Sequence, residues 1–141
     1  MPTLTPLIMR RIIAVGTMML MAACGDSSTG ITAASVAGTY NLSTVNGGGL
    51  PAVVATNPKL EVLGDVLVLS AAGSFTDKTI YRITQGTSVT TDSSSDAGAF
   101  VVSGTSVALH FSSDGTTSTG TISGTSLLVT QGGFSNVYVK Q

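Results

Sequence analysis

The sequence predicts an all-β fold, an up-and-down antiparallel β-barrel of about eight strands, and two observations support this prediction. From residue 36 onward, short runs rich in Val, Ile, Thr, Phe and Tyr alternate with Gly-containing turns, as in strands joined by hairpins. No segment shows apolar spacing of three and four residues over the length that a helix needs. Sequential antiparallel strands favour closure into a barrel, because closure removes exposed edges. A β-sandwich is the alternative.

Nine strands are expected, and turn residues separate them. The dipeptides Asn46-Gly47 and Asp114-Gly115 favour hairpins, because these residues tolerate positive φ. The tetrapeptide Ser-Gly-Thr-Ser occurs at 103–106 and again at 123–126, each time between strand-like runs, which indicates a β-meander in the C-terminal third. The expected strands are 37–45, 50–56, 60–70, 74–83, 98–103, 106–112, 117–123, 125–131 and 134–140.

Alternation along these strands predicts which side chains point inward. Val107, Leu109 and Phe111 share one face of their strand, and His110 lies on the other. The run 66–69, Val-Leu-Val-Leu, is apolar on both faces. One face of that strand therefore needs cover from a loop, a partner or the membrane surface.

Charge is sparse along the whole chain. Its 141 residues include six Lys and Arg against seven Asp and Glu, so the net charge is −1. No basic stripe is present, which argues against nucleic-acid binding. Because charged residues are few, Ser, Thr and Gly must form most of the solvated surface, as in many extracytoplasmic β proteins.

The first 23 residues are typical of an export signal. Arg10 and Arg11 precede an apolar run, 12–23, that only Gly16 and Thr17 interrupt. This run is shorter than the roughly 20 apolar residues that a membrane-spanning helix needs. We therefore expect residues 1–23 to be removed as a signal peptide.

The segment 20–24, Leu-Met-Ala-Ala-Cys, resembles a bacterial lipobox, although Met21 stands where Leu is commoner. The resemblance implies that Cys24 carries a lipid. Cys24 is the only cysteine, so it has no partner for an intramolecular disulfide; an ordinary signal followed by a buried cysteine is the alternative. Residues 24–35 are expected to be the lipidated cysteine and a flexible tether. Gly25 is not an Asp, so we expect the outer membrane rather than retention in the inner membrane.

The domain at 36–141 resembles small bacterial lipocalin-like lipoproteins. Their opening pattern is matched by Val-Ala-Gly-Thr-Tyr-Asn-Leu at 36–42, then Val-Asn-Gly at 45–47 and Leu-Pro at 50–51. Later matches, in order, are the hairpin at 68–75, Asp-Gly-Thr at 114–116 and the closing strand at 137–140.

This resemblance implies a barrel in which the strand with Gly38 and Tyr40 lies beside the last strand. In the wider lipocalin group, a cation from the last strand lies over an aromatic ring of the first. Here these residues would be Lys140 and Tyr40. The family transfers fold far better than function.

Candidate catalytic and metal-binding residues have simpler explanations. His110, the only histidine, would be the default base of a hydrolase, but alternation places it on the outer face. Asp92 and Asp96 could offer oxygen ligands to calcium, but the Gly and bidentate Glu of a calcium loop are missing. We expect 89–97 to be a long solvated loop at one barrel end. Glu61, Asp65 and Asp77 are scattered over strands without the spacing of paired catalytic carboxylates.

Aromatic side chains are the candidates for a ligand pocket, although in a small barrel they more often fill the core. They are Tyr40, Phe75, Tyr81, Phe100, Phe111 and Phe134. The sequence thus predicts a non-enzymatic, membrane-anchored, lipocalin-like lipoprotein of the cell envelope that binds a small apolar ligand, with no cofactor and no metal. The alternative is a structural or protein-interaction module with a solid barrel core. An open cavity of a few hundred Å³ would favour the first, and a solid interior with an exposed apolar patch the second.

Overall fold

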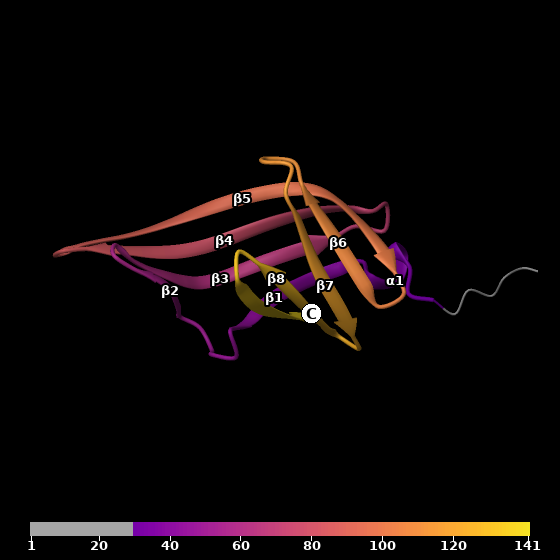
Figure 1. Ribbon diagram of the computed structural model, residues 1–141, viewed down its shortest axis with the longest axis horizontal. Helices are drawn as coiled ribbons and strands as arrows, with labels where there is room; N and C mark the ends of the chain where they lie inside the picture. Colours follow the sequence, from indigo (N-terminus) through magenta and orange to yellow (C-terminus); the bar gives the residue numbers. More distant parts are fainter. Residues whose placement is uncertain (1–29) are drawn as a thin grey trace, which may run out of the picture.

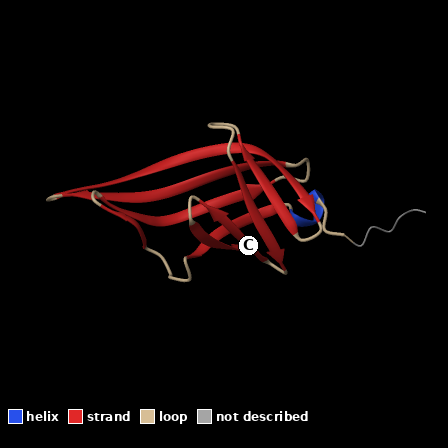
Figure 2. Ribbon diagram, in the orientation of Figure 1, coloured by secondary structure: helices blue, strands red, loops and turns tan. Residues whose placement is uncertain are grey.

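The computed structural model describes residues 30–141, which form a closed antiparallel barrel of eight strands with one additional strand (Figures 1 and 2). The elements are α1 (Ala33–Val36), β1 (Gly38–Val45), β2 (Ala52–Thr56), β3 (Lys59–Leu69), β4 (Ser74–Gln85), β5 (Ser88–Ser103), β6 (Ser106–Phe111), β7 (Thr117–Ser123), β8 (Ser126–Gln131) and β9 (Phe134–Lys140). The all-β prediction is confirmed. Apart from β5, the strands lie close to their expected ranges.

β1 closes the barrel. It pairs antiparallel with β9, where Tyr40 lies opposite Lys140, and with the second half of β3, where Tyr40 lies opposite Leu67. β2 pairs with the first half of β3, where Ala52 lies opposite Val62. β1 and β2 therefore follow one another along a single edge of β3, and β2 is the additional strand. The predicted pairing of the first and last strands is confirmed, and the sandwich alternative is wrong.

Glycines at positive φ form the predicted tight turns. Asn46 and Gly47 have φ of 49° and 79°, as a type I′ turn requires. Gly104 and Gly124 have φ of 60° and 59° at the first position of two-residue turns, which is the type II′ arrangement. The repeated tetrapeptide therefore marks two hairpins, as expected.

The prediction of a loop at 89–97 is wrong. These residues belong to β5, which pairs with β4 along its whole length, from Ser88 opposite Gln85 to Ala99 opposite Ser74. Ser and Asp disfavour strands only weakly, and the backbone ladder started at the Gly86 turn outweighs that preference.

The long strands give the barrel an uneven shape. β3, β4 and β5 are the longest strands, and together with the short β2 they project beyond the ends of β6 to β9, toward the left of Figure 1. We call this projecting part the extension. The end of the barrel from which it projects is the mouth.

The opposite end of the barrel is closed by α1 (Figure 2). Val36 is 3% exposed, and the Tyr40 hydroxyl donates a 2.7 Å hydrogen bond to the Val36 carbonyl. Ile31 and Ala33 also pack against the core, so the folded part begins near residue 31 and the tether expected at 24–35 is too long. The signal peptide, Cys24 and the first part of the tether lie outside the described residues.

The core fills the closed half of the barrel. Val107, Leu109 and Phe111 point inward as predicted, and the rings of Phe75 and Phe111 meet edge to face with centroids 5.1 Å apart. Leu67 and Leu69 are buried, whereas Val66 and Val68 lie on the outer face and are 37% and 38% exposed. Nothing in residues 30–141 covers these two valines.

Candidate ligand site at the barrel mouth

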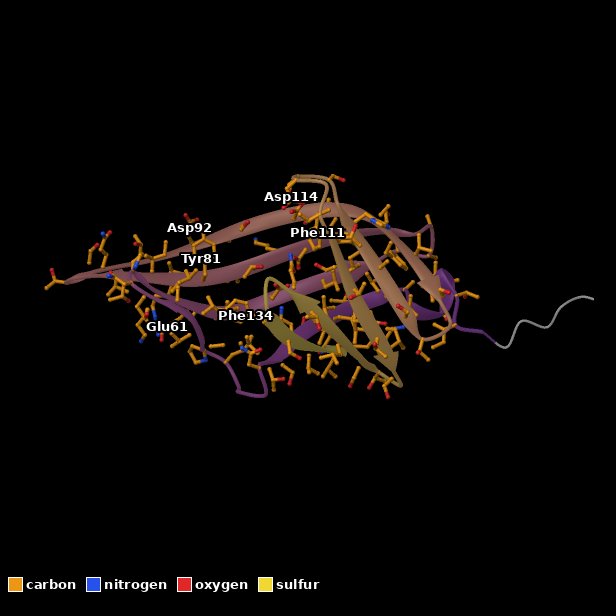
Figure 3. The ribbon with its side chains drawn as sticks, in the orientation of Figure 1. Glu61, Tyr81, Asp92, Phe111, Asp114 and Phe134 are labelled. Carbon is orange, nitrogen blue, oxygen red and sulfur yellow. The ribbon has the colours of Figure 1, made fainter. Side chains whose placement is uncertain are left out.

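A cavity of about 370 Å³ opens at the mouth, where the inner face of the extension passes the ends of the short strands. Its apolar wall includes Leu42, Val45, Val62, Phe111 and Phe134. Its polar wall includes Asp65, Asp77, Thr79, Asp96 and Tyr138. Figure 3 shows Phe111 and Phe134 on the short-strand side of this region, with Tyr81 and Asp92 farther out on the extension.

Strand register brings the acidic side chains of the polar wall together. Asp65 lies opposite Thr79 across β3 and β4, and Asp77 lies opposite Leu67. Because Asp65 and Leu67 are two residues apart, they share the inner face, and Asp77 is the diagonal neighbour of Asp65. Across β4 and β5, Asp77 lies directly opposite Asp96. Three carboxyl groups from three adjacent strands therefore line one wall.

Asp96 is held by donors from the protein. The Ser113 hydroxyl donates to its Oδ2 at 2.5 Å, and the Ala97 amide donates to its Oδ1 at 2.7 Å. Both oxygens of Asp96 are therefore occupied. Its carboxylate contributes charge to the cavity and keeps a fixed position.

Asp65 and Asp77 have free hydrogen-bonding capacity. Asp65 is only 9% exposed, and its Oδ2 accepts a 2.8 Å hydrogen bond from the Thr79 hydroxyl. Its Oδ1 is buried and accepts from no donor in residues 30–141, and the same holds for Oδ1 of Asp77. Buried oxygens without a donor are costly, by about 1–3 kcal/mol each, so such atoms call for an explanation.

The carboxyl groups perturb one another and Tyr138. Burial, a hydrogen bond to Asp65 and the negative charges of Asp65 and Asp96 raise the pKa of Asp77 to about 8. Asp77 therefore keeps its proton at neutral pH. Burial and the charges of Asp65 and Asp77 also raise the pKa of Tyr138. No Lys or Arg of the described chain lines the cavity to balance this acidity.

Glu61 lies outside the cavity, and two cationic side chains neutralise its charge. Glu61 is 2.9 Å from the Lys59 ammonium and accepts a 2.8 Å hydrogen bond from Nε of Arg82. The hydrogen bonds from Arg82 and Lys59 lower the pKa of Glu61 to about 2. This cluster joins β3 and β4 within the extension and has no free acceptor, which is typical of a structural ion pair.

The aromatic candidates divide between core and cavity. Phe111 and Phe134 line the cavity. Tyr40, Phe75 and Phe100 are at most 4% exposed and fill the barrel core, as their simpler explanation predicted. Tyr81 lies on the extension and does not line the cavity.

The polar candidates also have defined places. His110 is exposed on the outer face, as predicted, and its Nδ1 is 2.8 Å from the Thr117 hydroxyl. Asp92 is an exposed residue of β5 and not part of a loop. Among residues 30–141, no group of three His, Cys, Asp or Glu side chains is arranged to hold a metal ion.

Sequence reasoning missed the carboxyl pair. By alternation, Asp77 shares a face with Phe75, and Asp65 shares a face with the apolar residues Leu67 and Leu69. Pairing the two strands outward from the turn at 70–73 would have placed Asp65 and Asp77 together on the inner face. The loop predicted at 89–97 leaves Asp96 without a strand register, so the sequence does not place it beside the other two.

Comparisons of the chain with protein-family models, curated proteins and solved structures give no match. The resemblance to lipocalin-like lipoproteins therefore stays a prediction that rests on short motifs. In the described part of the chain, no helix has the length and apolar character needed to cross a membrane.

Proposed function

We propose that this protein is a non-enzymatic lipoprotein of the bacterial envelope that binds a small ligand in the mouth of its barrel. The observation that carries the binding proposal is the open cavity of about 370 Å³ with one apolar and one polar wall. Ligand pockets usually have volumes of about 300–1,000 Å³ and combine apolar walls with a few polar groups. The core fills the rest of the barrel, so the ligand would occupy only the mouth.

The anchoring part of the proposal rests on the sequence. The export signal at 1–23 and the lipobox ending at Cys24 support attachment to a membrane through a lipid. Gly25 supports the outer membrane. Such an anchor would hold the barrel at a membrane surface. The tether would join the barrel at its α1 end, opposite the cavity.

Native mass spectrometry of the protein extracted from its own membranes tests ligand binding. We expect a discrete additional mass that disappears on denaturation. Ser94 lines the cavity, whereas its neighbour Ser95 lies on the outer face, so the two residues offer a matched pair. Ser94→Phe should abolish the additional mass and Ser95→Phe should retain it. Loss of the mass in both variants, or its absence from the wild-type protein, would overturn the proposal.

A second candidate, a protein-interaction module, is favoured by one observation. The outer faces of β3 to β5 form a shallow groove whose floor includes the exposed Val66 and Val68. An apolar groove on an outer face is a common feature of interaction surfaces. Under this alternative, Ser95→Phe would release an envelope protein that crosslinks to the wild type, and Ser94→Phe would not.

A further inference from the structure

We propose that the cavity at the mouth takes a small amphipathic ammonium ion, whose N–H groups bind Asp65 and Asp77 while its hydrocarbon part lies against Phe111 and Phe134. This inference rests on the proposed ligand-binding function and names the chemical class of the ligand. Two features of the cavity lead to it: the buried carboxyl oxygens without a partner and the apolar side chains that line the cavity with them.

The free oxygens require a donor. Asp65 lines the cavity and is only 9% exposed, and its Oδ1 is buried beside the cavity without a hydrogen-bond partner in residues 30–141. Asp77 is half-buried and also lines the cavity, and its Oδ1 likewise has no hydrogen-bond partner in the described chain. An ammonium group carries several N–H donors in a compact volume, so a single group can serve both oxygens. A carboxylate or phosphate ligand would instead add negative charge beside three aspartates.

The charge of the wall requires a cation. In the empty cavity, the proton that Asp77 keeps relieves the repulsion between the carboxyl groups of Asp77 and Asp65. Asp96 adds a third negative charge from β5, and its oxygens are already bound by Ser113 and Ala97. Tyr138, on β9, faces the two carboxyl groups as a neutral phenol. Lys78, on β4, points toward the outer face. An entering ammonium would take the place of the Asp77 proton, which would be released to solvent.

The apolar wall selects an organic cation over a bare metal ion. Leu42, Val45, Phe111 and Phe134 offer hydrocarbon surface, and the neutral amide side chains of Gln131 and Asn136 lie among them in the lining. A hydrated metal ion would leave that surface in contact with water, whereas an alkyl or aryl group would cover it. The site therefore fits a ligand with a charged end toward Asp65 and Asp77 and an apolar end toward Phe111 and Phe134.

Three probes of equal chain length separate charge from apolar binding. Hexylammonium, hexanol and hexanoate are titrated calorimetrically into the purified full chain, with titrations into detergent buffer alone as blanks. We expect hexylammonium to bind about tenfold to hundredfold more tightly than hexanol, as charge-assisted hydrogen bonds to a buried carboxylate imply. Hexanoate should show no binding. Binding of hexylammonium should also release protons, seen as a heat that depends on the ionisation enthalpy of the buffer.

Isosteric variants test which groups are responsible. Asp65→Asn and Asp77→Asn should each bring hexylammonium affinity close to that of hexanol, with hexanol affinity kept. Asp92→Asn changes an exposed residue on the same strand as Asp96 and should alter the affinity for neither hexylammonium nor hexanol. Circular dichroism of each variant shows whether it is folded. Equal affinity for all three probes, or tighter binding of calcium than of hexylammonium, would overturn the ammonium proposal and leave ligand binding intact. Failure of every probe to bind would count against both proposals.

Discussion

The ammonium nitrogen of Lys140, in the last strand, lies 5.8 Å from the centroid of the Tyr40 ring in the first strand. The two residues are also direct partners in the ladder that closes the barrel. Gly38 leaves room for the lysine, because a Cβ at this position would lie 2.5 Å from Cε of Lys140. The contact expected from the lipocalin-like pattern is confirmed in geometry.

Lys140→Met tests the energy of this contact, because methionine keeps most of the apolar stem and removes the charge. We expect the free energy of unfolding to fall by about 0.5–1 kcal/mol, the usual range for an ammonium over a tyrosine ring. Urea denaturation measures the change. Lys78→Met, on the exposed outer face, is the control, and equal effects of the two substitutions would mean that the contact contributes nothing specific.

Barrel closure predicts that the last strand is indispensable. Deleting residues 134–141 removes the partners of both β1 and β8, together with the buried Tyr138, so the domain should unfold. Loss of the β signal in circular dichroism is the expected observation. Deleting Gln141 alone removes one backbone hydrogen bond, to Thr39, and should leave a folded protein. A folded 1–133 chain would show that closure is unnecessary.

The hairpin glycines should resist substitution for reasons of backbone conformation alone. Gly104 and Gly124 have positive φ, and a Cβ at either position would meet no atom within 4 Å. Replacing either by Val should therefore cost about 1–2 kcal/mol, entirely from strain. Gly49 also has open space but no positive φ, so Gly49→Val is the matched control. Thermal midpoints that are unchanged in the two hairpin variants would contradict the assigned turn type.

The raised pKa of Asp77 makes stability depend on pH. In the folded protein Asp77 keeps its proton up to about pH 8, whereas an unfolded chain releases it near 3.8. Between these values the folded state binds more protons than the unfolded state, so stability falls as pH rises. Asp77→Asn removes this dependence.

Urea denaturation of both proteins at about pH 4, 6 and 8 tests the sign of this linkage. The wild type should lose stability relative to the variant as pH increases, and taking the difference cancels the titration of groups such as Glu61. A difference that stays constant, or that changes in the wild type's favour, would mean that Asp77 titrates near its ordinary value in the folded state.

Cys24→Ser tests the anchor. If the lipobox is used, the variant should lose its acyl chains by mass spectrometry and should no longer partition into the detergent phase. Fractionation of wild-type cells should place the protein with outer-membrane markers. Membrane association that persists unchanged in the variant would show that another segment anchors the chain.

Local chemistry by itself determined the class of fold and most of its elements. Asn46, Gly104 and Gly124 set hairpins because their φ values are available cheaply only to Gly and Asn. Alternation along β6 placed Phe111 inside and His110 outside, since successive side chains point to opposite faces. The resemblance to lipocalin-like proteins implied the pairing of β1 with β9, and the cost of two open edges is its physical reason. These inferences need only neighbours in sequence or one general property of sheets.

Tertiary structure alone decided the extension and the acidic wall of the cavity. Residues 88–97 are polar enough to resemble a loop, and they are a strand because β4 offers a continuous ladder of hydrogen bonds. That ladder sets Asp96 against Asp77, and the β3–β4 register sets Asp77 beside Asp65. The three residues lie up to 31 positions apart in the chain. Their meeting depends on strand registers, which the folded barrel fixes as a whole and which no single segment encodes.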